Sequence, residues 1–141
     1  PPGKARRWRR VLRVLIAILV LGCLLPAPMQ IPVAGASVAD WNPRSFWFEP
    51  WGRSGVHKGI DIFAPKGRPV VAASAGVVLY HGEWAQGGRV LLVLGAKWRL
   101  HYYAHLDSID AHWGQPVLGG TRIGSVGDSG NAVGKAPHLH Y

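Results

Sequence analysis

Cysteine is almost absent from the chain, because Cys23 is the only one among 141 residues. A single cysteine cannot close an internal disulfide, so the sequence is not a disulfide-stabilised scaffold and must rely on its core and on any metal it binds. Cys23 lies inside an apolar run, where a free cysteine packs as a small hydrophobic residue. The residues from Leu19 to Cys23 match a lipoprotein acylation site poorly, and we expect Cys23 to be passive.

Acidic residues are also scarce, with 7 Asp and Glu against 16 Lys and Arg, which gives a formal net charge of +9. Six of the basic residues lie between Lys4 and Arg13, directly before an apolar run. A basic cluster directly before an apolar run is better explained by the positive-inside rule of membrane-directed segments than by phosphate contacts. We therefore predict no nucleic-acid partner.

There is one long apolar run, the 12 residues from Val14 to Leu25, all apolar or glycine. This length suits the apolar region of a signal peptide and falls short of the roughly 20 residues that a membrane-spanning helix needs. We predict that residues 1–25 form a basic N-region followed by a signal peptide or membrane anchor, with a buried core helix as the alternative. The protein would be exported to the periplasm or cell surface. Residues 11–25 would anchor it in the inner membrane unless cleavage near Ala34-Gly35-Ala36 removes them.

Helical periodicity is missing from the rest of the sequence. Residues 26–40 are broken by prolines, so we predict a linker there and a domain over residues 41–141. Short β-branched runs alternate with glycines in this domain, which indicates an all-β fold with a small antiparallel sheet. The expected strands are residues 69–73, 76–80, 89–94, 99–104, 122–126 and 138–141. We expect five aromatic residues ahead of His57 to cover the core or a sheet edge, with a groove wall as the alternative: Trp41, Phe46, Trp47, Phe48 and Trp51.

Histidines occur in two short patterns, His57-x-x-x-Asp61 and His138-x-His140, near the two ends of this domain. Imidazole and carboxylate are ordinary zinc ligands, and three protein ligands leave a fourth tetrahedral position for water. His138 and His140 would face one cavity if their segment is extended, because residues two apart on a strand point the same way. The two patterns together predict a divided zinc site, with one Zn²⁺ per domain, that folding must assemble.

The H-E-x-x-H motif, which supplies a glutamate as general base in many metalloproteases, is absent. A base must therefore come from elsewhere, and a histidine that titrates near neutrality can serve. His105 stands out because it follows a strand-like run, whereas His81, His101 and His112 have no comparable neighbours.

From about Gly52 to Tyr141 the sequence resembles the lysostaphin-type, or LytM-type, zinc endopeptidases, which cut the peptides of bacterial peptidoglycan. The main matching stretches, in chain order, are His57-Lys58-Gly59-Ile60-Asp61-Ile62, Pro69-Val70-Val71-Ala72-Ala73, Tyr103-Ala104-His105-Leu106, Gly114-Gln115-Pro116-Val117, Ser129-Gly130-Asn131 and Pro137-His138-Leu139-His140-Tyr141. The resemblance implies an antiparallel sheet with a substrate groove across it. It also implies that His57, Asp61 and His140 bind zinc, and that His105 and His138 are the catalytic pair beside the water at the metal.

The resemblance implies a zinc-dependent endopeptidase that hydrolyses peptide bonds in peptidoglycan stem peptides or cross-links, because all five functional positions are filled. The alternative is a non-catalytic module that binds peptidoglycan or activates another wall hydrolase, which would make wall-enzyme regulators its partners. Two features depart from the family pattern. His101 stands where a small polar residue is usual, and the chain stops at Tyr141, so we expect a domain truncated at its C-terminus.

Overall fold

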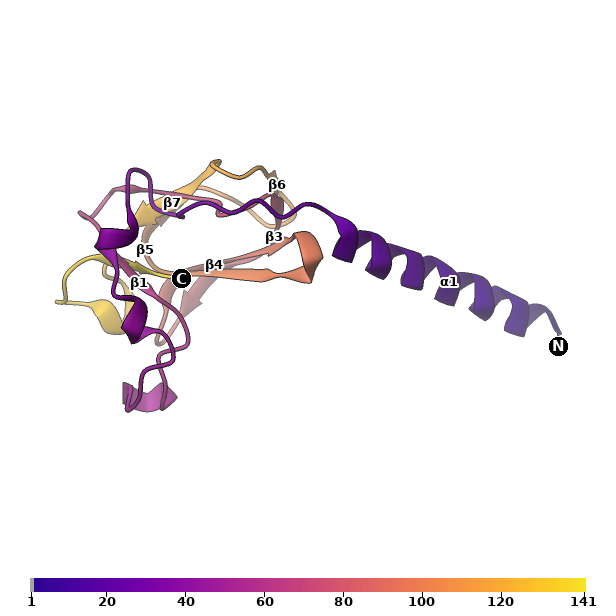
Figure 1. Cartoon of the computed structure of the whole chain (residues 1–141), viewed down its shortest axis with the longest axis horizontal. Coiled ribbons are helices and arrows are strands. Elements are labelled where there is room, and N and C mark those ends of the chain that lie inside the picture. The colour runs from indigo at the N-terminus through magenta and orange to yellow at the C-terminus, as the bar shows by residue number, and fades with distance from the viewer. Residues whose placement is uncertain (1) are drawn as a thin grey trace.

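The computed structural model describes residues 2–141, and all eight strands in this part of the chain belong to one antiparallel sheet (Figure 1). The strands are β1 (Asp61–Phe63), β2 (Pro69–Val71), β3 (Gly76–Trp84), β4 (Gly88–Gly95), β5 (Leu100–Ile109), β6 (Pro116–Val117), β7 (Arg122–Val126) and β8 (His138–His140). Their order is β1-β8-β5-β4-β3-β6, and β7 pairs with β2 and β5. The prediction of an antiparallel all-β domain is confirmed.

Three long strands, β3, β4 and β5, form the centre of the sheet. Each overlaps one of the predicted strands, but β3 continues to Trp84, and β5 begins at Leu100 and continues to Ile109. Strands β1 and β6, of three and two residues, were not predicted, whereas the equally short β2 and β8 lie within the longer predicted runs 69–73 and 138–141. The strand β1 matters for the site, since it carries Asp61.

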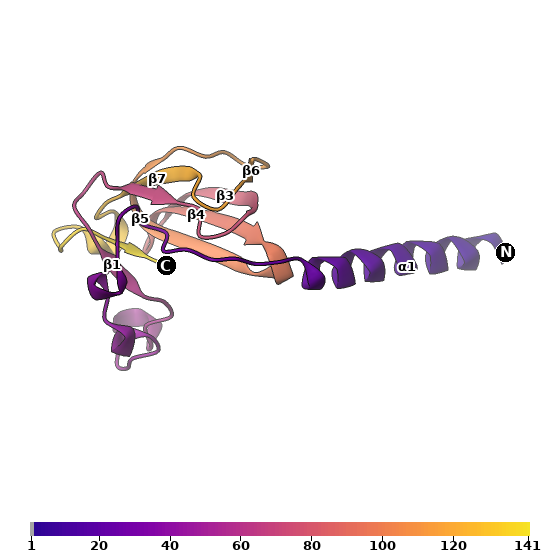
Figure 2. The ribbon, with the colours of Figure 1, turned by 45° about the horizontal axis from the view of Figure 1, so that its top comes forward.

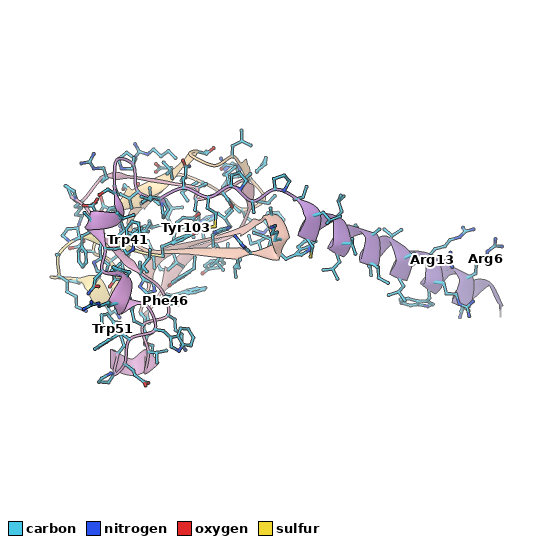
Figure 3. The ribbon with its side chains drawn as sticks, viewed as in Figure 1. Arg6, Arg13, Trp41, Phe46, Trp51 and Tyr103 are labelled. Carbon is cyan, nitrogen blue, oxygen red and sulfur yellow. The ribbon has the colours of Figure 1, made fainter. Side chains whose placement is uncertain are left out.

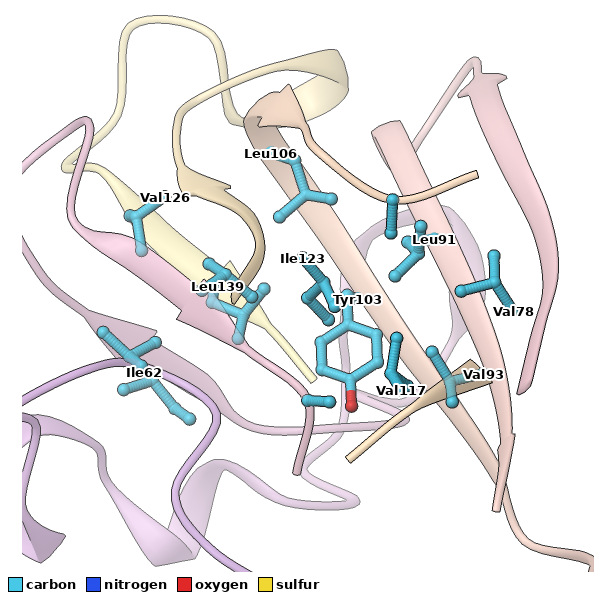
Figure 4. Close-up of a cluster of buried hydrophobic side chains, with 14 residues drawn as sticks. Ile62, Val78, Leu91, Val93, Tyr103, Leu106, Val117, Ile123, Val126 and Leu139 are labelled. Atoms are coloured by element: carbon cyan, nitrogen blue, oxygen red, sulfur yellow. The ribbon is translucent and has the colours of Figure 1, made fainter. Parts of the chain in front are cut away.

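The core is built around Tyr103 of β5, which is fully buried (Figure 4). The backbone N–H of Ala73 donates a hydrogen bond to the Tyr103 hydroxyl at 2.9 Å, so this buried polar group has a partner. Burial raises the pKa of Tyr103 and keeps it neutral. The surrounding apolar side chains come from β5 itself and from the other strands, and include Ile62, Val78, Leu91, Val93, Leu106, Val117, Ile123, Val126 and Leu139.

Part of the segment predicted as a linker, residues 26–40, packs against the sheet. Val33 is only 2% exposed, belongs to the core and forms an isolated β-bridge with Val70. The backbone of Gln30 donates to the Ala73 carbonyl at 2.9 Å, and Val71 donates to the Pro32 carbonyl at 2.9 Å. The prolines that break periodicity in this segment are compatible with an extended chain along a sheet edge, where ladder hydrogen bonds are few. The segment thus contributes to the core.

The N-terminal residues form a helix, α1 (Pro2–Leu24), which extends away from the sheet in both ribbon views (Figures 1 and 2). Trp98, in the short helix η4 (Ala96–Trp98), donates from Nε1 to the Leu19 carbonyl at 2.9 Å. Among residues 2–141, no helix combines the length and the apolar character that crossing a membrane requires. The signal or anchor role of residues 1–25 stays a prediction, and Pro1 lies outside the described residues.

The aromatic stretch ahead of His57 forms loops and the short helices η1 (Val38–Asp40), η2 (Pro43–Ser45) and η3 (Gly52–Ser54) (Figure 3). Trp41 packs against the core, as expected. The prediction that the rings cover the core or a sheet edge is wrong for Phe46, Trp47 and Phe48, whose side chains are more than half exposed. Their loops have short 3-10 turns in place of strands, so no sheet face holds these rings against the core. Trp51 takes the alternative position, on the wall of a groove.

Candidate metal centre

Pairing of β1 with β8 brings the two histidine patterns together. In this antiparallel pair Asp61 lies opposite His140, and Phe63 lies opposite His138. Ile60 and Tyr141 extend the pairing by exchanging backbone hydrogen bonds of 2.8 and 2.9 Å. Segments almost 80 residues apart in the chain therefore meet at one end of the sheet, as the divided site requires.

Three side chains converge on one point: His57, Asp61 and His140. Their ligand atoms all lie within 4.8 Å of one another. Asp61 Oδ1 is 2.8 Å from His140 Nδ1 and 3.1 Å from His57 Nε2, and the two ring nitrogens are 3.2 Å apart. Two imidazoles and one carboxylate form a donor set that suits zinc and leaves one tetrahedral position open.

The His57 imidazole is oriented by its second nitrogen. Its Nδ1 lies 2.9 Å from the Ser45 carbonyl oxygen, to which it can only donate, so Nε2 presents a lone pair to the cluster. A carbonyl behind a metal-binding histidine fixes both ring tautomer and ring direction. Trp51 stacks on the His57 ring with centroids 4.2 Å apart, and His57 is 1% exposed. Packing and hydrogen bonding together preorganise this ligand.

The surroundings of Asp61 favour its ionised form. Burial on its own would raise the pKa of Asp61, but the hydrogen bond with His140 and the nearby imidazoles of His138, His140 and His57 outweigh it and lower the pKa below its ordinary value. An ionised carboxylate is the form that binds a metal ion.

Two further histidines, His105 and His138, lie beside this cluster. Their ring centroids are 4.9 Å apart, and His138 Nε2 is 3.9 Å from Asp61 Oδ1. His105 Nδ1 lies 2.9 Å from the Ser129 carbonyl, and His138 Nδ1 lies 2.8 Å from the Ala136 carbonyl. Each ring thus donates from Nδ1 and keeps a lone pair on Nε2. Both can accept a proton from a group bound at the cluster.

A β-bulge directs His105 to the site. The register between β4 and β5 shifts in this region. His105 has a φ of 61°, in the left-handed region that residues other than glycine rarely adopt. Tyr103, two residues earlier, is in the core, and a regular strand would send His105 to the same face. Burial lowers the pKa of His105 to about 4, so the ring is neutral at neutral pH.

Ser129 holds the bulge from outside the strand. Its carbonyl accepts from His105, and its hydroxyl donates to the Leu106 carbonyl at 2.8 Å while accepting from the Arg89 backbone at 3.0 Å. Gly88 fits here because a Cβ at that position would meet Ser129 Oγ. The Ser129-Gly130-Asn131 stretch therefore supports His105 through hydrogen bonds.

The five residues open onto a groove of about 960 Å³. Its lining comes from the loop around η3, the turn between β3 and β4, and the loop between η5 (Gly130–Ala132) and β8. The predicted groove is therefore present, and it is bordered by the candidate ligands and by these three loops.

The other histidines lie apart from this cluster. His81 and His112 are exposed, and neither lines the groove. His101 is buried between the Ser74 hydroxyl, 3.0 Å from Nε2, and the Tyr141 hydroxyl, 2.6 Å from Nδ1. It therefore supports the residue that follows His140. Sequence reasoning missed the carbonyls of Ser45, Ser129 and Ala136, since any residue type can present a carbonyl and only the fold selects these three.

Comparison with known proteins decides the family. Residues 55–141 match Peptidase family M23. The chain belongs to this family. The matched range contains all five clustered residues and every strand of the sheet. The lysostaphin-type and LytM-type resemblance of the sequence is thereby confirmed for the M23 domain.

Individual relatives agree with this assignment. The L-Ala–D-Glu endopeptidase of Bacillus subtilis is 40% identical over 111 residues, which are 72% of this chain and 34% of that protein. The catalytic domain of lysostaphin from Staphylococcus simulans superposes with a TM-score of 0.60 and 33% identity, covering 64% of this chain and 69% of that one. A zinc-containing peptidase from Vibrio cholerae gives a TM-score of 0.66 and 30% identity, covering 82% and 36%. The chain spans about a third or less of the curated relatives it matches.

Proposed function

We propose that the M23 domain is a zinc-dependent endopeptidase that hydrolyses peptide bonds in peptidoglycan stem peptides or cross-links. The observation that carries the proposal is the convergence of His57, Asp61 and His140 beside His105 and His138, in the floor of one groove. The Bacillus relative is an L-Ala–D-Glu endopeptidase, and the Vibrio neighbour is a zinc-containing peptidase.

His57 Nε2, Asp61 Oδ1 and His140 Nδ1 would hold the zinc ion. When bound, zinc supplies a Lewis acid that polarises the scissile carbonyl and lowers the pKa of water towards about 7. The rings of His105 and His138 lie beside this position. One ring would accept the proton of the attacking water through Nε2 and deliver it to the leaving amine as the C–N bond breaks. The other ring would donate to the oxyanion in its protonated form, with a proton taken from solvent before the reaction and kept throughout it.

We further propose that the protein works in the bacterial cell envelope, where peptidoglycan is found. The basic residues from Lys4 to Arg13 and the apolar run from Val14 to Leu25 support export. The side chains of this run are mostly exposed along α1. An exposed apolar helix of this kind must either be buried in an apolar environment or be removed. A membrane anchor would bury it, and cleavage as a signal peptide would remove it.

Purified peptidoglycan incubated with the full chain and zinc tests the proposal. Mass spectrometry should find released fragments with a new amine and a new carboxyl terminus, and this pair of termini names the bond that is cut. A chelator should stop the release, and added zinc should restore it.

The alternative, a non-catalytic module, makes the opposite prediction. Peptidoglycan would be retained but not cut, and Asp61→Asn would leave cellular function intact. Retention of wall material by a zinc-loaded chain that releases no fragment would therefore favour the alternative.

A further inference from the structure

The groove at the metal centre is strongly cationic. Three basic side chains line it, Arg53, Lys58 and Lys135, and all three are exposed. Among the described residues that line the groove, Asp61 is the single carboxylate, and its Oδ1 is engaged by His57 and His140. A bound divalent ion would add further positive charge.

These three cations are not neutralised by the protein itself. Elsewhere on the domain basic side chains do pair, as Lys66 does with Asp128 at 2.8 Å and Arg122 with Asp110 at 2.6 Å. Arg53, Lys58 and Lys135 form no ion pair with any residue between 2 and 141. Their charge is available to a ligand.

The cations belong to the two segments that build the metal centre. Lys58 directly follows His57, and Arg53 lies in η3 just before it. Lys135 lies three residues before His138, in a loop held by the backbone hydrogen bond from Lys135 to Ala132 at 2.9 Å. A peptide that reaches the catalytic pair therefore passes basic side chains contributed by both segments.

We infer that the groove selects peptides with free carboxylates close to the scissile bond over peptides of the same backbone whose carboxylates are amidated, and over neutral glycine bridges. The inference rests on the proposed function and specifies its substrate class. Opposite charges attract across the groove, and each exposed pair contributes a factor of roughly 1.4 to 5 in affinity or kcat/KM. Three pairs together give a discrimination of roughly tenfold.

A matched pair of synthetic cross-linked stem peptides provides the test, one with free carboxylates and one with the same carboxylates amidated, together with a pentaglycine peptide. The zinc-supplemented full chain should cleave the free form with a kcat/KM roughly tenfold above that of the amidated form, and it should also cleave pentaglycine more slowly than the free form. The preference should shrink as salt is added, because exposed charges are screened.

The triple variant Arg53→Gln, Lys58→Gln, Lys135→Gln should cleave the free and amidated peptides with nearly equal kcat/KM. The matched control is Lys4→Gln, Arg68→Gln, Lys97→Gln, which removes the same charges from exposed positions that do not line the groove. It should keep the wild-type preference. Equal cleavage of both peptides by the wild type, or a triple variant that keeps the preference, would overturn the inference.

Binding to the chelated chain separates this inference from the proposed function. In the chelated chain the metal contributes no charge. Fluorescence anisotropy should show that this chain binds the amidated labelled peptide more weakly than the free form, and that the triple variant binds both forms with equal affinity. If the zinc-loaded chain cuts none of the peptides but this binding preference is present, the hydrolase proposal fails and the inference stands. If the wild type cuts peptides and shows no binding preference, the inference alone fails.

Discussion

His105 combines an unusual backbone conformation with a position beside the candidate metal ligands. Its φ of 61° occurs at a bulge, where Ser129 and the Gly87 carbonyl hold it through hydrogen bonds of 2.9 and 2.8 Å. Residues in strained conformations that the surroundings maintain are typical of functional sites. The strain supports a role for the ring beyond packing.

Replacing His105 with Asn removes the imidazole while keeping a residue that tolerates positive φ. We expect His105→Asn to lower kcat for peptidoglycan peptides by about 100-fold or more, since a general acid–base group contributes that much. Zinc affinity should be unchanged, because His105 is outside the ligand set. Isothermal titration with zinc and a peptide-release assay measure the two effects, and a variant that cleaves at the wild-type rate would remove His105 from the mechanism.

The buried His105 ring also makes the stability of the metal-free chain depend on pH. Its pKa is about 4 in the folded chain against 6.5 ordinarily, so between these values the unfolded chain binds a proton that the folded chain does not. The contribution of the neutral His105 ring to the free energy of unfolding should be fully present above pH 6.5 and should fall by about 3 kcal/mol as the pH falls to 4. Urea unfolding across this range should show a steep decline for wild type and a shallower one for His105→Asn; parallel curves would contradict the assignment.

At the scale of elements, the junction of β1 and β8 controls the ligand geometry. A Cβ on Gly59 would lie 2.8 Å from His140 Nε2 and 2.8 Å from the Tyr141 carbonyl oxygen, closer than side chains approach. The backbone pairing of Ile60 with Tyr141 leaves little room for the junction to widen. Gly59 thus permits the close approach of the two ligand-bearing segments.

Gly59→Ala should push His140 away from Asp61 and reduce zinc affinity about tenfold, a typical effect of disturbing the surroundings of a metal ligand. Gly119→Ala is the control, because its Cβ would meet Ser74 Cα at an ordinary 3.7 Å and its φ is not in the left-handed region. Competition with a zinc-binding dye reports both affinities. Equal zinc affinities in the two variants would contradict the prediction, because they would mean that β1 and β8 can separate without moving the zinc ligands.

Sequence patterns located six of the eight strands and missed β1 and β6. The strand β7 has the predicted bounds of residues 122–126, and β4 differs from the prediction by one residue at each end. The two-residue β6 carries no periodic signal, and His105 was placed after a strand although it lies within β5. A bulge that turns one side chain depends on contacts with Gly87 and Ser129, which are distant in the chain and invisible in local patterns.

At the scale of the whole molecule, the five candidate residues could be named from sequence because their types and order are specific. Their roles as ligands and as a catalytic pair stay predictions, although the fold places all five at one groove. The groove aromatic Trp51 could not be separated from its exposed neighbours Phe46, Trp47 and Phe48. All four rings share the same local composition, and only tertiary folding stacks one of them on His57.

The extent of the folding unit is a further prediction at this scale. Val33 is buried in the core, so a chain that begins at residue 41 should be less stable than one that begins at residue 26, by about 2 kcal/mol or more for the lost side chain. Removing residues 1–25 alone should cost little, since the core side chains all follow residue 32. Thermal unfolding of the two shortened chains checks this, and equal melting temperatures would support the predicted domain boundary at residue 41.

The central claim is that one zinc ion, held by His57, Asp61 and His140, makes the domain a peptidoglycan hydrolase. The most direct measurement is the rate of peptidoglycan hydrolysis by the metal-free full chain as zinc is added in measured equivalents. We predict no hydrolysis without metal, a linear rise in rate as zinc is added, and a plateau at one zinc per chain. Hydrolysis that proceeds at full rate without zinc, or that never begins while zinc is bound, would contradict it.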